Sequence, residues 1–267
     1  MRHKKQIWGN LIVFVILIGI IGGLTWKVNH PKDQWGKTQQ KKVIVIGVDD
    51  TFVPMGFRNS KGELVGYDVD LARKTFQAMG LKVKFQVIDW SMKETELKSK
   101  HIDAIWNGYT ETPERAKHVA FSESYHQDEQ VILTLKDHNF KQAKDLKNHD
   151  LGIQTGSSGA ASYDGQPHIL KSIIRDTVQY DDFSKALNDL QVDRIQGVLI
   201  DSDYARYYIA HSTQGNQFQM LQTRFPKEQF VVGFRKSDVK LRLAVNKQLA
   251  KFEKDSTISE LTEKYFN

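Results

Sequence analysis

Short apolar runs separated by amphipathic segments begin at residue 43 and continue to the end of the chain. Runs 43–48, 83–88 and 102–106 are rich in β-branched or alternating apolar residues, which predicts strands. Segment 69–79 has apolar positions near helical spacing, and segment 92–100 is a short lysine-rich stretch that we expect to be a helix with a solvated face. The order strand, helix, strand, helix, strand predicts a parallel, doubly wound sheet.

A second set of similar elements follows the first. Its expected strands are 129–135, 151–154, 178–180 and 195–200, and its expected helices are 184–192 and 202–211. A last strand, 230–235, precedes helices at 241–252 and 258–266. We therefore expect one α/β unit interrupted by another, with the chain crossing between them near 125–129 and 226–230.

The N-terminal residues follow a different pattern. Residues 11–24 are uncharged and almost wholly apolar, and a cationic leader precedes them. Trp8 and Trp26 are 18 residues apart, about 27 Å along a helix, close to the ~30 Å thickness of a bilayer core. We expect 1–26 to be an uncleaved transmembrane anchor that leaves the rest of the chain outside the cell membrane.

A cleaved signal peptide is the alternative for this N-terminal region, and the protein would then be secreted. Gly23-Leu24-Thr25 is only a weak substitute for the usual small-residue cleavage site. Residues 27–42 are polar and non-periodic, which predicts a linker.

Composition narrows the function classes. The 267-residue chain has no cysteine, which excludes disulfides, thiolate metal sites and a cysteine nucleophile. Its net charge is +6, but eight of the 38 Lys and Arg residues and one of the 32 Asp and Glu residues lie in 1–42. The remaining 30 basic and 31 acidic residues nearly cancel, so the main body has no overall field that would attract nucleic acid.

The stretch 103–122 carries the clearest candidate chemistry. After the strand, Asn107-Gly108 breaks the regular backbone, and Thr110 or Thr112 can cap the following helix, which contains Arg115 one turn in. Free N–H groups at a helix start and a guanidinium fork together suit a carboxylate. A surface ion pair is the simpler interpretation of Arg115 taken alone.

Polar or aromatic residues also follow other expected strands. Asp49 and Phe52 come after the first strand, Trp90 after the second, and Asp201 after run 195–200. Ligand crevices of open α/β sheets form at such strand ends. The Gly/Ser turn 155–160 opens a helix and is a second place suited to an anion, although it lacks the Lys-Ser/Thr ending of a phosphate loop.

These pieces together resemble the polar amino-acid substrate-binding proteins of ABC importers, which have the type 2 periplasmic-binding fold and form solute-binding protein family 3. The resemblance covers about 43–266. The matching segments are Ile-Gly-Val-Asp-Asp-Thr-Phe-Val-Pro, Gly-Glu-Leu-Val-Gly-Tyr-Asp-Val-Asp-Leu-Ala, Ile-Asp-Ala-Ile-Trp-Asn-Gly-Tyr-Thr-Glu-Thr-Pro-Glu-Arg, Leu-Gly-Ile-Gln-Thr-Gly-Ser-Ser-Gly and Val-Leu-Ile-Asp. It implies two lobes, each a mainly parallel sheet flanked by helices. Lobe 1 would comprise 43–127 and 231–267, and lobe 2 would comprise 128–230.

The resemblance implies a site for a zwitterion between the lobes. Arg115 would bind the ligand carboxylate, helped by the N–H groups of Thr110 and Ser158. Asp201 would bind the ammonium, together with the Thr110 hydroxyl and a carbonyl oxygen. The carbonyl would come from Asn107 or Gly108.

The same resemblance places the ligand side chain between Phe52 and Trp90, with Asp49 near its tip or supporting the cleft. Met55-Gly56 stands where several relatives have Phe-Glu, which weakens the case for lysine or arginine. Gln154 stands where a lysine marks some glutamine binders, and Gln196 departs from the usual pattern without a functional explanation. Glutamine, cystine, basic and other polar amino acids all remain candidates.

The implied function is extracytoplasmic binding of a polar amino acid and its delivery to the permease and ATPase of an ABC importer. We expect a monomer without catalytic residues, metal, cofactor or bound nucleic acid. A membrane-tethered amino-acid sensor is one alternative. A cyclohexadienyl dehydratase-like enzyme is another, for which Glu111 would be the one unusual acid or base.

Overall fold

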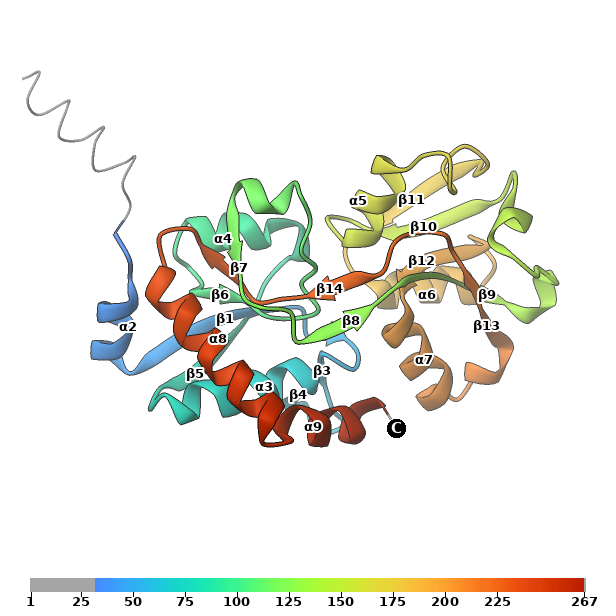
Figure 1. The fold of residues 1–267 in the computed structure, drawn as a ribbon. Coiled ribbons are helices and arrows are strands. Elements are labelled where there is room, and N and C mark those ends of the chain that lie inside the picture. Colours follow the sequence, from blue (N-terminus) through green and yellow to red (C-terminus); the bar gives the residue numbers. More distant parts are fainter. Residues whose placement is uncertain (1–31, 267) are drawn as a thin grey trace, which may run out of the picture.

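Two five-stranded sheets, each flanked by helices, form two lobes that lie side by side (Figure 1). The structure is a computed structural model that describes residues 32–266. In lobe 1 the strand order is β5-β1-β6-β15-β7, and in lobe 2 it is β11-β10-β12-β9-β13. The two-lobed α/β fold expected from the sequence is confirmed. The expectation that each sheet is mainly parallel is wrong, because each sheet is mixed, with two parallel and two antiparallel pairings.

Lobe 1 is built from both ends of the chain. Its elements are α2 (Trp35–Lys41), β1 (Val43–Val48), β2 (Thr51–Phe52), β3 (Gly56–Arg58), β4 (Leu64–Val65), α3 (Tyr67–Ala78), β5 (Lys82–Val87), η1 (Trp90–Met92), α4 (Lys93–Lys98), β6 (Ala104–Ile105), η2 (Arg115–Lys117), β7 (Val119–Phe121), β15 (Gly233–Arg235), α8 (Val239–Lys254) and α9 (Thr257–Phe266). Strand β1 pairs in parallel with β5 and β6, whereas β15 runs antiparallel to β6 and β7. The apolar side chains of β1 and the helices around it make the core, and Ile44, Ile46 and Val48 are fully buried.

Lobe 2 is one continuous segment with the same kind of layering. Its elements are β9 (Gln130–Leu135), η3 (Lys136–His138), η4 (Ala143–Leu146), β10 (Asp150–Gln154), α5 (Ser158–Gly165), β11 (Asp176–Tyr180), α6 (Phe183–Gln191), β12 (Gly197–Asp201), α7 (Ser202–His211), η5 (Gly215–Gln217) and β13 (Phe218–Gln222). Helix α6 buries Phe183, Ala186, Leu187 and Leu190 at helical spacing against the sheet. Strand β10 is parallel to β11 and β12, whereas β9 is antiparallel to β12 and β13.

Two short antiparallel strands join the lobes, where the sequence predicted the chain to cross. They are β8 (His126–Asp128) and β14 (Glu228–Phe230), with Glu228 opposite Asp128 and Phe230 opposite His126 (Figure 1). The strand expected at 230–235 is therefore two strands, β14 in the connection and β15 in lobe 1. Strands β7, β8 and β13 were not predicted, because three to five residues give too little periodicity to read.

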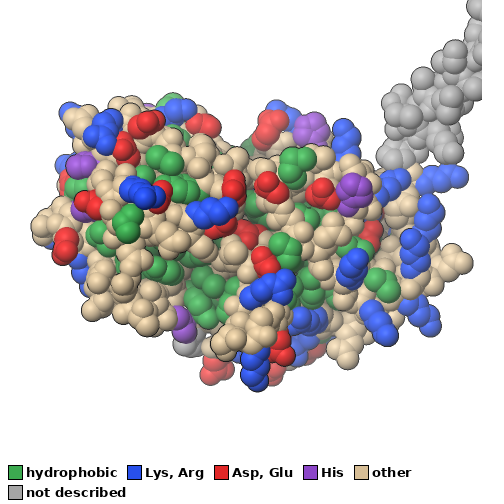
Figure 2. Space-filling view, turned by 180° about the vertical axis from the view of Figure 1, so that it is seen from behind, with side chains coloured by type: hydrophobic (Ala, Val, Ile, Leu, Met, Phe, Trp, Pro, Cys, Tyr) green, Lys and Arg blue, Asp and Glu red, His purple; other side chains and the backbone are tan. Residues whose placement is uncertain are grey.

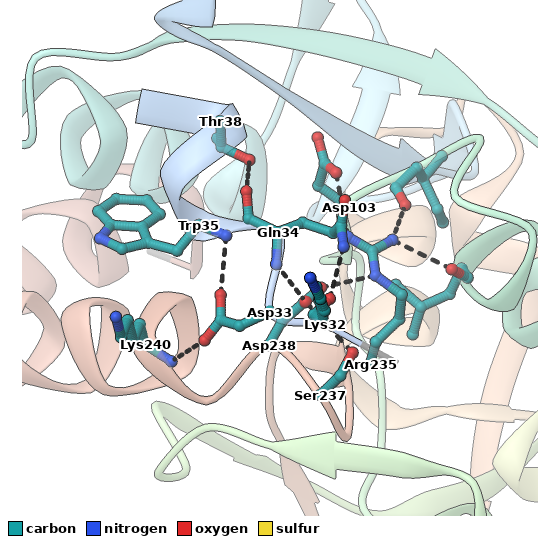
Figure 3. A network of polar contacts seen from close by, with 12 residues as sticks. Lys32, Asp33, Gln34, Trp35, Thr38, Asp103, Arg235, Ser237, Asp238 and Lys240 are labelled. Carbon is teal, nitrogen blue, oxygen red and sulfur yellow. Dashed lines mark hydrogen bonds and ion pairs between the residues drawn. The ribbon is translucent and has the colours of Figure 1, made fainter. Parts of the chain in front are cut away.

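The predicted linker is wrong in its last part, where 35–41 form helix α2 on lobe 1. Asp33 accepts hydrogen bonds from the backbone of Trp35 at 2.7 Å and of Lys240 at 3.0 Å, and the latter nitrogen lies in the first turn of α8. The backbone of Gln34 donates to buried Asp238 at 3.0 Å (Figure 3). A polar, non-periodic sequence is typical of a linker, but here the polar groups of Asp33 and Gln34 make hydrogen bonds that hold the segment on lobe 1.

Asp238 connects this docked segment to the interior of lobe 1. Its carboxylate accepts a hydrogen bond from Arg235 at 2.6 Å, and Arg235 also bonds Asp103 at 3.1 Å (Figure 3). Arg235 donates further to the carbonyl oxygen of Ile102 at 2.6 Å. The chain that enters lobe 1 at residue 33 is thus linked through one polar network to the strand region that precedes the candidate site.

Within the part of the chain that the structure describes, no helix is long and apolar enough to cross a membrane. The predicted anchor, 1–26, lies outside that part.

Candidate functional site

Arg115 begins the single 3₁₀ turn η2 and reaches across the interface between the lobes. Its terminal nitrogens donate to the carbonyl oxygens of Thr110 at 2.7 Å and of Gly156, in lobe 2, at 3.1 Å. The guanidinium lies 4.6 Å from the centre of the Tyr109 ring, and its Nε atom is 3.5 Å from the Glu94 carboxylate. These contacts fix the orientation of the planar guanidinium group of Arg115. A guanidinium held in this way suits planar anions such as a carboxylate.

The turn before Arg115 forms for the local reason that the sequence suggested. The Thr112 hydroxyl accepts a hydrogen bond from the Arg115 backbone nitrogen at 3.1 Å, so Thr112, not Thr110, is the capping residue. The expected helix is only one 3₁₀ turn long. Thr110 is consequently free for a different role, and its hydroxyl donates to Glu228 at 2.8 Å.

Glu228 is a buried carboxylate in the connecting strand β14, and sequence reasoning missed it. Burial raises its pKa, against the opposing influence of the Ser158 and Thr110 hydroxyls and of the Arg115 charge. Ser158 lies at the start of α5 in lobe 2, where it also accepts a hydrogen bond from Gln130 at 3.4 Å. The predicted residues Thr110, Arg115 and Ser158 thus meet around one carboxylate. A lone Glu before an expected crossing gave no signal in the sequence.

Asp201 ends β12 and is 4 % exposed. Burial raises its pKa well above the ordinary value, and the neighbouring charges of Asp128 and Glu228 raise it further. Asp128, on strand β8, also has a pKa raised by burial, to about 7. Three carboxyl groups therefore share one buried region beside the connecting strands, which strongly favours either bound protons or a cation.

Asn107 and Gly108 make the sharp turn that follows β6. Gly108 has φ +56°, and a Cβ atom there would lie 2.5 Å from Cε1 of Phe52, so only glycine fits. The Gly108 nitrogen donates to the fully buried carboxylate of Asp68 at 2.6 Å. Asp68 lies in the first turn of α3, whose N-cap is Gly66, and its carboxylate holds the turn after β6.

Asp49 connects lobe 1 to lobe 2. Its Oδ2 atom accepts a hydrogen bond from Gln154 Nε2 at 3.1 Å, and its backbone nitrogen donates to Asn107 Oδ1 at 3.1 Å. Burial raises the pKa of Asp49, which the hydrogen bonds from Thr51 and Gln154 only partly oppose. Asn107 Nδ2 is buried without a hydrogen-bond partner among the described residues. Asp49 thus lies in the interface, and its place near the tip of a ligand stays a prediction.

Phe52 and Trp90 are both in lobe 1 and both 7 % exposed. Phe52 packs on Phe183 and Tyr204 of lobe 2, with ring centres 6.0 and 5.6 Å apart. Trp90 stands edge-on to Tyr109 at 6.1 Å. The structure thus places Phe52 against lobe 2 and Trp90 against Tyr109 of lobe 1, and the sandwiching of a ligand side chain by the two stays a prediction.

Lys93 was expected on a solvated helix face, and that expectation is wrong, since it is 2 % exposed. Its Nζ atom donates to the carbonyl oxygens of Trp90 and of Gly156, each at 2.8 Å. Burial, together with the charge of the nearby Arg115, lowers the pKa of Lys93 to about 7. Two cations from lobe 1 thus converge on one carbonyl of lobe 2, so this side of the interface favours an anion.

Direct contacts close the two lobes over the site. Two surface hollows lie elsewhere in the described residues. One, of about 540 Å³, lies between the lobes and is lined by Phe57, Tyr204 and Tyr207 among others. The other, of about 580 Å³, is on lobe 1 and includes Lys98 and Lys100 in its lining.

Viewed from behind, the outline is indented between the lobes, and Lys and Arg side chains gather along the right-hand edge, on lobe 1 (Figure 2). No cluster of His, Asp and Glu suited to a metal ion is found among residues 32–266.

The interface therefore has an arginine and a lysine on one side and carboxylates beside the connecting strands, which suits a small zwitterion held between two lobes. The family model for bacterial extracellular solute-binding proteins, family 3, matches residues 44–267. The chain therefore belongs to that family of proteins, as the sequence motifs indicated.

Individual relatives agree with this assignment. The chain is 26 % identical over 260 residues to the L-cystine-binding protein TcyJ of Escherichia coli, covering 94 % of this chain and 93 % of that protein. It is 27 % identical over 231 residues to the arginine-binding extracellular protein ArtP of Bacillus subtilis, covering 86 % and 89 %. A crystal structure of a Streptococcus pneumoniae ABC uptake transporter substrate-binding protein with bound histidine is 44 % identical, with a TM-score of 0.86 and coverage of 88 % and 96 %. All three are named as binding proteins.

Proposed function

We propose that this protein binds a polar amino acid between its two lobes, outside the cell membrane, and delivers it to the permease and ATPase of an ABC importer. One observation carries the proposal. The charge of Arg115, from lobe 1, lowers the pKa of Glu228, and the charge of Glu228 raises the pKa of Asp201, from lobe 2, so both residues lie near the same carboxylate. A fork for a carboxylate and an acid for an ammonium, supplied from opposite lobes, match the two charges common to all amino acids.

The ligand is a polar amino acid whose side chain carries an N–H donor. Asp49 and Gln154 are hydrogen-bonded to each other across the interface, and because both N–H groups of Gln154 are already donated, the pair offers only oxygen acceptors to a polar tip. Histidine is the first ligand to test, because a 44 % identical protein was crystallised with it. Cystine, arginine and glutamine are the competitors that must be tested beside it. The role is binding without catalysis.

A thermal-unfolding screen of the full-length chain tests the proposal. Each of the twenty amino acids and cystine is added singly, because a ligand present at 100 times its Kd stabilises the folded state by about 2.7 kcal/mol. A marked rise in the unfolding temperature with one or a few polar amino acids is expected. No rise with any of them would contradict the proposed function.

We further propose that residues 1–26 anchor the mature protein in the membrane. The apolar run between Trp8 and Trp26 and the cationic leader before it support this. The mass of the intact mature protein should correspond to a chain that retains these residues, and the protein should fractionate with membranes. A mature chain that begins near Trp26 would show that the segment is a signal peptide.

Closure on the ligand completes the proposed cycle. Because the two clamp residues belong to different lobes, a bound zwitterion stabilises the closed arrangement more than the open one. Small-angle scattering should therefore give a smaller radius of gyration with ligand than without. Tight binding with no compaction would contradict this step.

A further inference from the structure

The hydroxyl group of Thr110 already has a partner for its proton. It donates to Oε2 of Glu228 at 2.8 Å, and the two residues are 3 % and 7 % exposed. A hydroxyl has one proton and two lone pairs. With the proton held by Glu228, the oxygen can only accept, so any further partner of Thr110 Oγ1 must be a hydrogen-bond donor.

Thr110 is held from both sides in this way. Its carbonyl oxygen accepts from Arg115 at 2.7 Å, and its hydroxyl is held by Glu228 from the connecting strand β14. Through its bond to Glu228 the hydroxyl lies beside the buried region in which the charge of Glu228 raises the pKa of Asp201. A donor that enters there experiences negative charge as well as an oriented acceptor.

Glu228 is an unfavourable residue for stability alone. It is buried, and it pairs directly with Asp128 on the neighbouring strand. Like charges directly opposite one another in an antiparallel pair are destabilising, and so is burial of a carboxylate. A glutamine or an apolar side chain would fit the strand at lower energetic cost, so folding does not account for this carboxylate.

We propose that Glu228 is a positioning residue for the bound amino acid: it holds the Thr110 hydroxyl proton so that the oxygen accepts a hydrogen bond from the ligand ammonium. This rests on the proposed function and extends it to a residue in the connection between the lobes. Asp201 supplies the direct ionic partner, and Glu228 acts through Thr110.

Calorimetric titration of the full-length chain tests this proposal. The probe is an equimolar mixture of the twenty standard L-amino acids with L-cystine, so no prior ligand assignment is needed. Glu228→Ala should lower the apparent affinity about tenfold, because the hydroxyl is released to rotate. Glu228→Gln keeps an acceptor oxygen and should recover most of the loss, to within about threefold of wild type. Glu123→Gln, an exposed glutamate outside the interface, is the matched control and should stay within about twofold.

A double-mutant cycle separates positioning from simple structural support. Thr110→Val removes the hydroxyl and should itself cost about tenfold or more. In that background Glu228→Ala should cost less than about threefold more, because no hydroxyl is left to orient. The unfolding temperature of each variant is measured in parallel, and Glu228→Met replaces Glu228→Ala if the alanine variant does not fold.

The possible results distinguish the two proposals. If wild type gives no binding heat with the mixture, the proposed function fails and this inference fails with it. If wild type binds but Glu228→Ala binds within twofold of it, only the role of Glu228 is overturned. If the losses from Thr110→Val and Glu228→Ala multiply independently, Glu228 does not act through Thr110, and the inference is wrong. Recovery by Glu228→Gln to within about threefold of wild type, with the coupling to Thr110 preserved, supports the inference, and no recovery by Glu228→Gln contradicts it.

Discussion

Gln154 of lobe 2 donates a hydrogen bond from Nε2 to the Oδ2 atom of Asp49 in lobe 1, at 3.1 Å, with both side chains buried. The same Gln154 amide group donates to the Asp181 carbonyl oxygen at 3.0 Å, so it is fixed within its own lobe. Asp49 is fixed in its lobe by the hydroxyl and backbone of Thr51. The hydrogen bond therefore joins two side chains that are each fixed within their own lobe, and it is one of the direct links between the lobes.

We predict that Gln154→Leu makes the ligand-free protein open more readily. The substitution removes an interlobe hydrogen bond and leaves the Asp49 carboxylate with one partner fewer, which costs roughly 1–3 kcal/mol in the closed state. Small-angle scattering without ligand should then give a larger radius of gyration than wild type. Gln77→Leu, on the exposed face of α3, is the control. Equal radii for Gln154→Leu and wild type would show that this pair does not hold the lobes.

The buried carboxyl of Asp128 predicts a particular pH dependence of stability. Burial, together with the charge of Asp203, raises its pKa from 3.8 to about 7. Between pH 4 and pH 7 the folded state therefore binds more protons than the unfolded state at this group, so its contribution to stability falls as pH rises. Asp128→Asn removes that contribution to the pH dependence.

Urea unfolding of the ligand-free, full-length chain at pH 4.5 and at pH 7.0 measures the effect. Relative to wild type, Asp128→Asn should gain at least about 1 kcal/mol of stability on going to the higher pH, since one pKa unit corresponds to about 1.4 kcal/mol. Asp137→Asn, on an exposed turn, is the control. The same pH difference in wild type and in Asp128→Asn would mean that Asp128 is ionised throughout this range.

Gly108→Ala should destabilise the fold and disturb the site. The backbone there has φ +56°, and the added Cβ would meet the ring of Phe52 at 2.5 Å. The strained backbone alone costs roughly 1–2 kcal/mol, and the clash adds to it. Gly62→Ala has φ +77° with nothing within 4 Å, so it carries the strain without the clash. Equal urea midpoints for the two variants would show that Phe52 moves aside freely.

Asp33→Ala should release helix α2 from lobe 1. The Asp33 carboxylate caps the first turn of α8 through the Lys240 nitrogen, and loss of such a cap costs about 1 kcal/mol. The urea midpoint should fall, and limited proteolysis should cut near residues 32–42 faster than in wild type. Lys37→Ala, on the exposed side of the same helix, should change neither. Unchanged proteolysis in Asp33→Ala would show that the docking does not depend on this carboxylate.

The sequence predicts most of the fold because its strongest signals are long apolar strands and amphipathic helices. Helix α7 begins and ends where the pattern 202–211 indicated, and β1 matches run 43–48. The errors lie where tertiary contacts override the local pattern. Helix α2 forms in a polar stretch because lobe 1 supplies partners for Asp33 and Gln34.

The candidate site is predictable only in part. Arg115 could be named from its place after a strand end, and Thr110 and Ser158 could be named from the family resemblance. The structure brings the three together around Glu228. Glu228 itself, and the buried Lys93, have no local signal. A charged residue in a short strand or on a lysine-rich helix is normally solvated. Their partners, Thr110 for Glu228 and Gly156 for Lys93, are distant in the sequence.

In the proposed function, Arg115 and Asp201 hold opposite ends of one ligand. Calorimetric titration of the full-length chain with the mixture of amino acids described above, on wild type, Arg115→Ala and Asp201→Asn, tests it most directly. Removal of one partner from a buried, charged hydrogen bond costs roughly 2–5 kcal/mol, so both variants should lose detectable binding while keeping the wild-type circular dichroism spectrum. Binding weakened less than about fivefold in either folded variant, a loss of only about 1 kcal/mol, would remove that residue from the site and contradict the account.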